Sequence, residues 1–193
     1  MAAALALASE RGPLAVTVGS ITQRLNAPTG SFYHRFISRD MLLTELWLRI
    51  NSDYQQGLTA ALDAGDALGA ALHALIWSRQ HLNEARVLLL NRRHDFVHGE
   101  GPEALREALH LEDERNQAAV SRFAYLAFGG TTVEQLRRAQ FLLVEVPVAA
   151  VLQHLERWEP PPSIVDELVI TTYRAIVADD RGSTATFALG RAG

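Results

Sequence analysis

The sequence contains no cysteine and no lysine among its 193 residues. The absence of cysteine excludes disulfide bonds and thiolate metal sites, and it suits a cytoplasmic protein. No run of 18 or more apolar residues occurs, so the sequence predicts no membrane span and no membrane partner. The apolar stretch at the N-terminus has no basic residues before it, and we interpret it as a first helix and not as a signal peptide.

Strand patterns are also missing. The best candidate, Val16 to Val18, is too short for a strand. Hydrophobic residues make up 48% of the chain, an ordinary level for a globular protein that argues against disorder. With 193 residues, the chain is long enough for one or two small domains with a sizeable core. We therefore predict an all-α fold of about nine helices.

Apolar periodicity, N-cap residues and glycine or proline stops place the nine expected helices. They cover residues 2–11, 17–25, 29–35, 39–58, 67–82, 85–96, 103–128, 133–158 and 164–178. Pro147 should kink or split the eighth helix, because proline lacks a backbone N–H and clashes with the preceding turn. The tail at 180–193 is expected to fray, although Phe187 and Leu189 are apolar side chains that would be able to dock.

The stretch from 17 to 26 has the features of a short helix that ends in a tight turn. Thr17 is placed to N-cap this helix, because its hydroxyl can accept an orphan backbone N–H. Val18, Ile21 and Leu25 then fall on one apolar face. Asn26 follows, and asparagine tolerates the left-handed conformation that a tight turn needs.

A second short helix is expected directly after this turn. Pro28 suits the first position of a helix, and Phe32 and Phe36 are spaced to face the core. Two short helices across a tight turn are typical of a helix-turn-helix, whose second helix enters the major groove of DNA by its N-terminal end. Gly30 would allow this helix to approach the groove closely, because it has no side chain.

Positive charge is concentrated on the same stretch. Between 17 and 39 the sequence contains Arg24, Arg35 and Arg39 and no acidic residue, which gives +3 on a chain whose net charge is −4. Neutralisation of DNA phosphates requires such a local cationic patch. The charge pattern therefore favours DNA binding over the alternative that the two helices merely pack together.

Many residues of this region match one known pattern at the same time. They are Glu10-Arg11-Gly12, Thr17-Val18, Ile21, Gly30-Ser31-Phe32-Tyr33, Phe36, Arg39 and Leu42. Over residues 3–46 the chain thus resembles the DNA-binding segment of the TetR family of transcriptional regulators. It departs from the family at Thr22, where alanine is usual, at Asn26, where glycine is usual, and at Thr29, where lysine is frequent. Arg39 stands in place of a lysine, and the basic residues that usually precede the first helix are absent.

The resemblance implies a role for each matching residue. Phosphates would be held by Thr17, Tyr33, His34 and Arg39, and base edges would be faced by Thr29, Gly30 and Ser31. For Tyr33 the alternative of a core aromatic stays open. The resemblance also implies a three-helix, helix-turn-helix head at 1–46 that binds double-stranded DNA. A larger helical-bundle body at 47–193 would bind ligand and form the dimer.

For the body, the resemblance implies a pocket for a small-molecule effector that releases a repressor from a palindromic operator. Candidate pocket residues are His73, Trp77, Arg93, Phe96, Phe123, Phe141 and Glu145, although each aromatic among them is equally an ordinary core residue. The last two long helices carry wide apolar stripes, and by the resemblance they pair with their mates in a homodimer. A dimer suits a palindrome, because two heads match two half-sites.

Two other classes of function remain open. The chain would be a small-molecule or metal-binding module with weak or no specific DNA binding if its head lacks phosphate contacts. His94 and His98 lie at i, i+4, and His73 and His81 lie two turns apart, but no third metal ligand is evident. An enzyme is not expected, because the sequence has no nucleophile elbow, phosphate loop or HExxH motif. No cofactor and no resident metal are expected either.

Overall fold

The computed structural model describes residues 1–98 and 103–189, with side chains up to 180. Over these residues the chain is all-α, as predicted, with no strand. The helices are α1 (Ala2–Arg11), α2 (Val18–Leu25), α3 (Gly30–Tyr33), α4 (Arg39–Asp63), α5 (Ala67–Gln80), α6 (Leu82–Leu90), α7 (Glu103–Phe128), α8 (Val133–Gln140), α9 (Val146–Glu156) and α10 (Ile164–Leu189). Short turns η1 (Pro13–Ala15) and η2 (Arg93–Asp95) and the π-helical turn η3 (Phe141–Glu145) join them.

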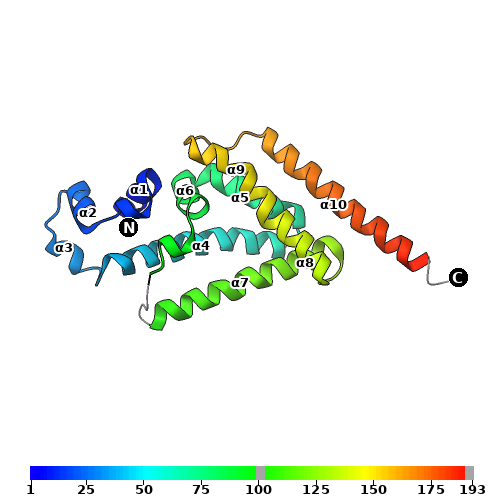
Figure 1. Ribbon diagram of the computed structural model, residues 1–193, viewed down its shortest axis with the longest axis horizontal. Coiled ribbons are helices and arrows are strands. Elements are labelled where there is room, and N and C mark those ends of the chain that lie inside the picture. Colours follow the sequence, from blue (N-terminus) through cyan, green and yellow to red (C-terminus); the bar gives the residue numbers. More distant parts are fainter. Residues whose placement is uncertain (99–102, 190–193) are drawn as a thin grey trace.

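The three N-terminal helices lie at one end of an elongated molecule (Figure 1). Helix α4 runs from this head into the body, where α7 and α5 lie along it and α9 packs in turn on α5 and α6. Helix α10 extends away from the head and ends at the far side of the molecule. None of the helices described is both long and apolar enough to span a bilayer.

Helices α1 and α7 have the predicted bounds, whereas α4 continues five residues beyond its expected end at 58. Gly57 does not stop it, because the glycine serves a close helix contact. A Cβ atom at this position would lie 2.4 Å from Cε1 of His73 on α5. Leu58 and Leu62, both buried, then carry the apolar face of α4 to its end.

The sixth helix was expected at 85–96, and this prediction is wrong at both ends. Helix α6 starts at Leu82 and stops at Leu90. Its end is fixed by Asn91, whose amide donates to the carbonyls of Arg86 and Val87. The Val87 carbonyl is one of the last four of the helix, which have no donor within the helix itself. The chain then turns through η2, where the backbone N–H of Arg92 donates to Asp95 Oδ2 at 2.8 Å.

The expected split at Pro147 is present. Pro147 is the second residue of α9 and follows the π-helical turn η3, so the region 133–158 forms two helices joined by a wider turn. A π turn re-routes the helical hydrogen bonds at a place where proline supplies no N–H. The expected fraying from 180 is not observed, since α10 continues to Leu189. The predicted docking of Phe187 and Leu189 and the end of the tail lie outside the side chains and residues described.

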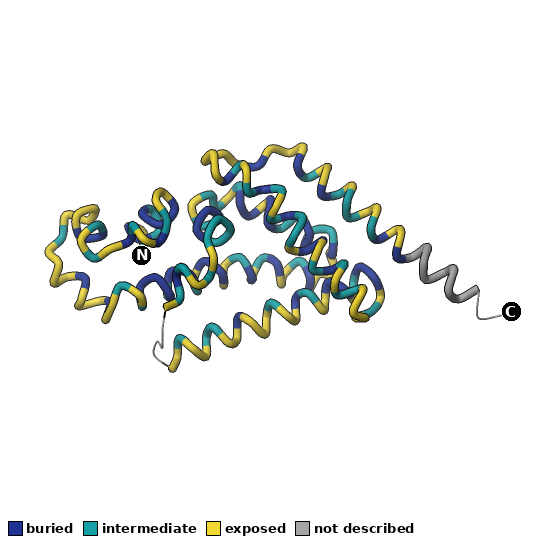
Figure 2. The backbone as a smooth tube through the Cα atoms, viewed as in Figure 1, coloured by how far each residue is buried: buried dark blue, intermediate teal, exposed yellow. Residues whose placement is uncertain are grey.

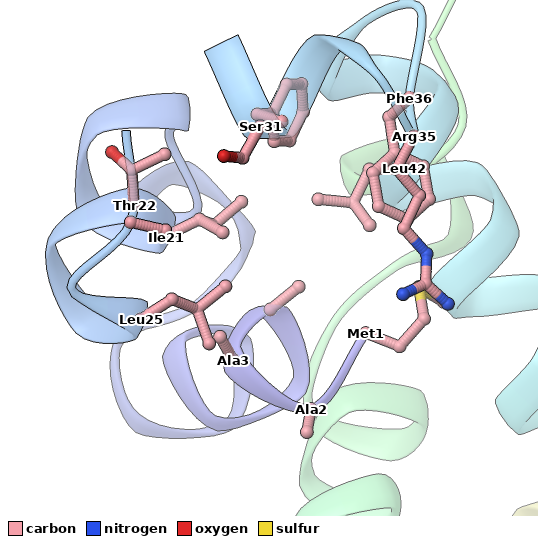
Figure 3. A pocket seen from close by; sticks show the side chains of 13 residues that line it. Met1, Ala2, Ala3, Ile21, Thr22, Leu25, Ser31, Arg35, Phe36 and Leu42 are labelled. Atoms are coloured by element: carbon pink, nitrogen blue, oxygen red, sulfur yellow. The ribbon is translucent and has the colours of Figure 1, made fainter. Parts of the chain in front are cut away.

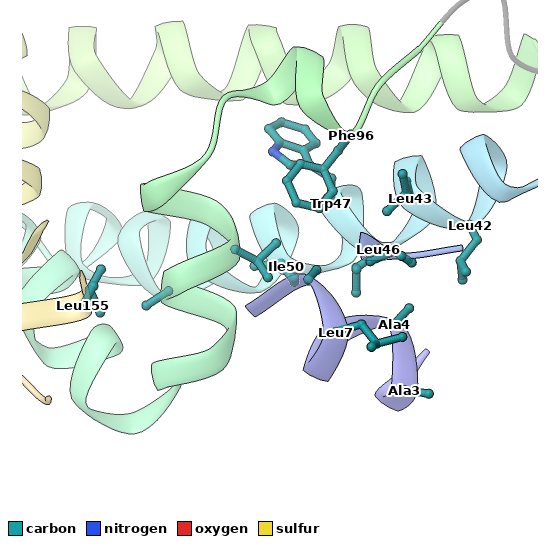
Figure 4. Packing of buried hydrophobic residues seen from close by; sticks show 14 of the residues in the cluster. Ala3, Ala4, Leu7, Leu42, Leu43, Leu46, Trp47, Ile50, Phe96 and Leu155 are labelled. Carbon is teal, nitrogen blue, oxygen red and sulfur yellow. The ribbon is translucent and has the colours of Figure 1, made fainter. Parts of the chain in front are cut away.

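Buried residues form two hydrophobic clusters. The first joins the head to the body: Leu42, Leu46 and Ile50 of α4 pack with Ala4 and Leu7 of α1 (Figure 4). The second fills the far end, where α4, α5, α7, η3 and α10 meet. Figure 2 shows the buried positions along α4, α5 and α9, while the first half of α7 is mostly exposed. The first cluster runs without interruption past residue 46, so the division into 1–46 and 47–193 stays a prediction.

Candidate functional site

The start of α2 and the turn after it have the predicted chemistry. Thr17 caps the helix: its Oγ1 accepts the N–H of Ser20 at 3.0 Å, and the N–H of Thr17 donates back to Ser20 Oγ at 2.9 Å. This reciprocal pair is a capping box. At the other end Asn26 has φ 48° and ψ 45°, the left-handed conformation expected of it. Thr17 is exposed, and its predicted contact with a phosphate is untested.

Helix α3 is shorter than predicted, but its helical conformation extends on both sides. Thr29 has φ −56° and ψ −34°, and His34 has φ −68° and ψ −22°. The N–H of Phe36 still reaches the carbonyl of Phe32 at 2.9 Å. Phe32 and Phe36 are 5% and 8% exposed, so these two rings fix the orientation of α3 on the head.

The opposite side of α3 faces solvent. Thr29, Gly30, Ser31, Tyr33 and His34 are all exposed. Tyr33 is 59% exposed and touches Phe32 only edge-on, at 5.3 Å between ring centroids, so the alternative that it is a core aromatic is wrong. All five residues that the resemblance assigns to DNA contact in this segment are therefore accessible, and Ser31 also lines a hollow inside the head.

The cationic patch is weaker than the sequence suggested, because acids outside the segment fold onto it. Glu10 of α1 accepts two hydrogen bonds from Arg24, at 2.7 and 2.9 Å. The bond lowers the pKa of Glu10 and raises the pKa of Arg24, so both stay charged. Arg39 donates to Asp40 at 3.0 Å and to the carbonyls of Val16 and Pro13 at 2.6 and 2.8 Å.

Arg39 therefore ties the start of α4 to the segment before α2, which leaves few of its donors for a phosphate. Arg35 is different, because its side chain is exposed and its guanidinium lies 5.9 Å from the ring of Phe36. In the sequence, Arg35 contributes only to the positive charge of residues 17–39. Its side chain also lines the hollow inside the head, where its guanidinium lies beside Met1 (Figure 3).

A hollow of about 410 Å³ lies inside the head (Figure 3). It is bordered by alanines of α1, by Ile21, Thr22 and Leu25 of α2, and by Phe32 and Phe36. The small side chains of α1 cover α2 and α3 incompletely, and Leu25 remains 59% exposed as a result. Thr22 satisfies its hydroxyl within α2 by donating to the carbonyl of Val18 at 2.9 Å.

The residues predicted to form an effector pocket do not converge. Phe96 and Phe123 are fully buried, and they belong to different hydrophobic clusters. Trp77 is also buried, and its indole N–H donates to Asp53 Oδ2 at 2.9 Å. His73 Nε2 lies 2.8 Å from the carbonyl of Tyr54, and burial lowers the pKa of this histidine.

The other three predicted pocket residues lie near the surface. Arg93 pairs with Asp113 at 2.5 Å. Glu145 pairs with Arg137 at 3.2 Å. Phe141 is 39% exposed and borders a groove between η3 and α10. The described structure therefore does not bring these seven side chains to one place, because they lie on elements whose faces point in different directions.

A different cavity is present in the body, with a volume of about 830 Å³. It lies among α4, α6, α7, α8, η3 and α9, and none of the seven predicted residues lines it. Much of its wall is apolar, with Leu88 and Leu89 from α6 and Val120 from α7. Its polar residues include Gln55 from α4 and Asn116 from α7.

Two polar residues in the sequence of α4 indicate this cavity. Asn51 and Gln55 interrupt an apolar stripe of α4 between Ile50 and Leu58, and both are more than nine-tenths buried. Polar residues at buried positions of a stripe need partners, so they point to a polar wall or a site. Leu88 and Leu89 of α6 are only partly covered, because they border the cavity.

The histidine pairs do not form a metal site in the described residues, where no three potential ligands gather. His94 lies in the short turn η2 and His98 beyond it, so the two do not share an α-helical face. His94 pairs with Asp95 at 3.5 Å, and His98 Nε2 lies 3.1 Å from the Asp95 carbonyl.

Comparison with known proteins identifies the N-terminal region. Residues 1–46 match the family model of bacterial regulatory proteins, tetR family. No curated protein and no solved structure gives a significant match to the chain. The match covers the capped α2, the left-handed turn and the exposed face of α3. Residues 1–46 are therefore a helix-turn-helix region of the tetR family, which marks the chain as a DNA-binding transcription regulator.

Proposed function

We propose that the protein is a repressor that binds a palindromic operator as a homodimer and leaves it when a small-molecule effector enters the body. The observation that carries this proposal is the exposed face of α3, which Phe32 and Phe36 anchor from behind. A recognition helix must be held rigidly and still present its polar side chains to the groove. The cytoplasmic location predicted from the sequence belongs to the same proposal.

On the DNA, Thr29, Gly30 and Ser31 face base edges, while Thr17, Tyr33 and His34 contact phosphates. Arg39 acts mainly by holding the start of α4 in place, and Arg35 supplies the positive charge beside the backbone. The space around Gly30 supports its assignment, because a Cβ atom there would meet no atom of the protein within 4 Å. The fold does not require glycine at this position, whereas a closely approaching DNA surface would.

The dimer forms through the segment α8–α9 and α10. Ile164 and Leu168 are 54% and 62% exposed and lie one turn apart on α10. Phe141 of η3 borders a groove together with Ala175 and Ile176 of α10. Exposed apolar side chains of this kind favour contact with a second copy. Two heads then contact two half-sites of a palindrome.

The effector acts through α4, which borders both sites. Its middle, at Asn51 and Gln55, lines the body cavity. Its first turns, at Leu42 and Leu46, pack under the head. An effector that binds more tightly to a form with a displaced α4 shifts the population to heads whose spacing no longer fits the operator.

The test is a DNA-binding assay with a fragment from upstream of the protein's own coding region, repeated across salt concentrations. We expect protection of a palindrome and an affinity that falls steeply with salt. Tyr33→Ala should weaken binding by about tenfold or more, as expected for a lost phosphate contact. The matched control is Tyr125→Ala, which removes a tyrosine of α7 that is 65% exposed and should leave the affinity unchanged.

A second candidate function is a ligand-binding module without specific DNA binding. The pairing of Arg24 with Glu10 and the internal bonds of Arg39 favour it, because they reduce the free charge on the head. Binding that is weak and equal on any duplex, with no effect of Tyr33→Ala, would support this candidate and overturn the first.

A further inference from the structure

The chemistry of the body cavity points to a class of ligand, and this inference rests on the proposed role of the cavity as an effector site. Side chains of α4 and α7 meet along one wall of the cavity. Asn51 donates to Glu112 Oε2 at 2.8 Å. One turn further on, Gln55 Nε2 donates to Asn116 Oδ1. Asn51, Gln55 and Asn116 line the cavity, whereas Glu112 lies behind them.

Gln55 is the unusual member of this row. Its side chain is 7% exposed, and its Oε1 has no hydrogen-bond donor within range among the residues described. A buried carbonyl oxygen without a donor costs free energy comparable to a lost hydrogen bond. A ligand that brings a donor to Gln55 Oε1 would recover this free energy, and an apolar ligand would not.

The cavity has little charge to offer a ligand. The carboxylate of Glu112 is already compensated by Arg115, at 2.7 Å, and by the amide of Asn51. Arg137 borders the cavity, but its side chain is 74% exposed and pairs with Glu145. Tyr54 is the titratable residue next to Gln55 on the wall, and burial raises its pKa to about 12, so its phenol stays neutral. A charged ligand would lose its hydration without gaining an unpaired partner inside.

We propose that the cavity binds an uncharged amphipathic molecule, an alcohol or phenol, whose hydroxyl donates a hydrogen bond to Gln55 Oε1. Its hydrocarbon body lies against Leu88, Leu89 and Val120. A volume of about 830 Å³ is in the range of pockets that enclose drug-sized molecules, which are mostly apolar with a few polar groups that fix orientation. The hydroxyl selects the ligand, and the apolar wall supplies most of the contact area.

Three matched probes test this class by calorimetric titration of the full chain without DNA. They are 4-hexylphenol, its methyl ether 4-hexylanisole, and 4-hexylbenzoate, which share the same hydrocarbon body. We expect the phenol to bind about tenfold more tightly than the ether, the ratio that one buried hydrogen bond gives. The benzoate should bind more weakly than the phenol, because its charge has no unpaired partner.

A variant then assigns the preference to Gln55. Gln55→Met keeps the length of the side chain and removes the carbonyl oxygen, so the ratio of phenol to ether affinity should fall to about one. The matched control is Gln56→Met, at the exposed neighbouring residue that does not border the cavity, and it should keep the tenfold ratio. Thermal unfolding of both variants checks that they are folded, and the comparison of the three probes on the unaltered protein needs no variant.

Equal affinity for phenol and ether, tighter binding of the benzoate, or no binding of any probe would each overturn the inference. These outcomes are separate from the failure of the proposed function. Phenol binding that depends on Gln55 but leaves operator affinity unchanged would sustain the ligand class and remove the effector role. If a compound released the operator equally well from the Gln55→Met variant, the effector role would stand and the proposed ligand class would be wrong.

Discussion

Replacing Arg86 should reveal a connection between the head and the far end of α9. Its Nε donates to the carbonyl of Ser9 at 3.0 Å, its Nη1 donates to the carbonyl of Leu155, and its guanidinium lies 3.8 Å from the ring centroid of Trp158. The Ser9 carbonyl is in the last turn of α1. Its helical partner would be the N–H of Pro13, which proline does not have. Arg86 therefore supplies the donor that the sequence of α1 removes.

The magnitude of the effect follows from these contacts. Arg86 is 9% exposed, so its bonds are shielded from water. Two hydrogen bonds from a charged group contribute about 1.5–3 kcal/mol each, and the contact with Trp158 about 1 kcal/mol. The free energy needed to bury the charge offsets part of this sum. Burial also lowers the pKa of Arg86, because removing the guanidinium from water disfavours its charged form. We expect Arg86→Met to lower the free energy of unfolding by about 3 kcal/mol.

The assay is urea unfolding followed by helical circular dichroism at a fixed protein concentration. Arg106→Met is the matched control, because Arg106 is exposed on α7 and its loss should change the free energy of unfolding by less than about 0.5 kcal/mol. Arg86→Lys should fall between the two, since an ammonium cannot reach both carbonyls as the planar guanidinium does. A difference below about 1 kcal/mol between Arg86→Met and the control would refute the reasoning.

Three further predictions concern glycine positions and pH. Gly57→Ala should lower the free energy of unfolding by about 1–3 kcal/mol, measured by urea unfolding, because its Cβ would collide with the ring of His73; an unchanged midpoint would show that the ring moves freely. Gly30→Ala should leave the unfolding midpoint almost unchanged and still weaken operator binding about tenfold; full retention of affinity would contradict close approach at this position. Because burial lowers the pKa of His73 in the folded state, the unfolded chain binds more protons below pH 6.5, so stability should fall as the pH drops through this value. The fall should be smaller in His73→Gln, and equal pH profiles would rule out the histidine as its source.

Local features of the fold were predictable from the sequence wherever a short-range rule fixes the backbone. The cap at Thr17, the left-handed turn at Asn26 and the two-helix split at Pro147 each depend on the chemistry of one residue and its immediate neighbours. The anchoring of α3 by Phe32 and Phe36 followed from their spacing of four, because such residues share one face of a helix. The exposed side of α3, which we propose contacts DNA, is the complement of that buried face.

Predictions failed where distant segments meet. Glu10 is seven residues outside the cationic segment, yet it reaches Arg24 across two packed helices. The end of α6 depended on the amide of Asn91, which competes with continuation of the helix. The seven residues expected to line a pocket are spread over the body, because residue type does not determine which face of a helix points to a cavity. Phe96 and Phe123 joined separate cores for this reason.

By itself the sequence determined the all-α class, the order of the helices and the head at the N-terminus, because helix periodicity, caps and turns are local properties of a chain. Only the tertiary structure decided which cations of the head stay free and where the body is hollow. Both depend on the packing of α4 against α1 and α7, which brings together residues such as Gln55 and Asn116 that are 61 positions apart. Such pairings are set by helix positions and rotations that no short stretch of sequence encodes.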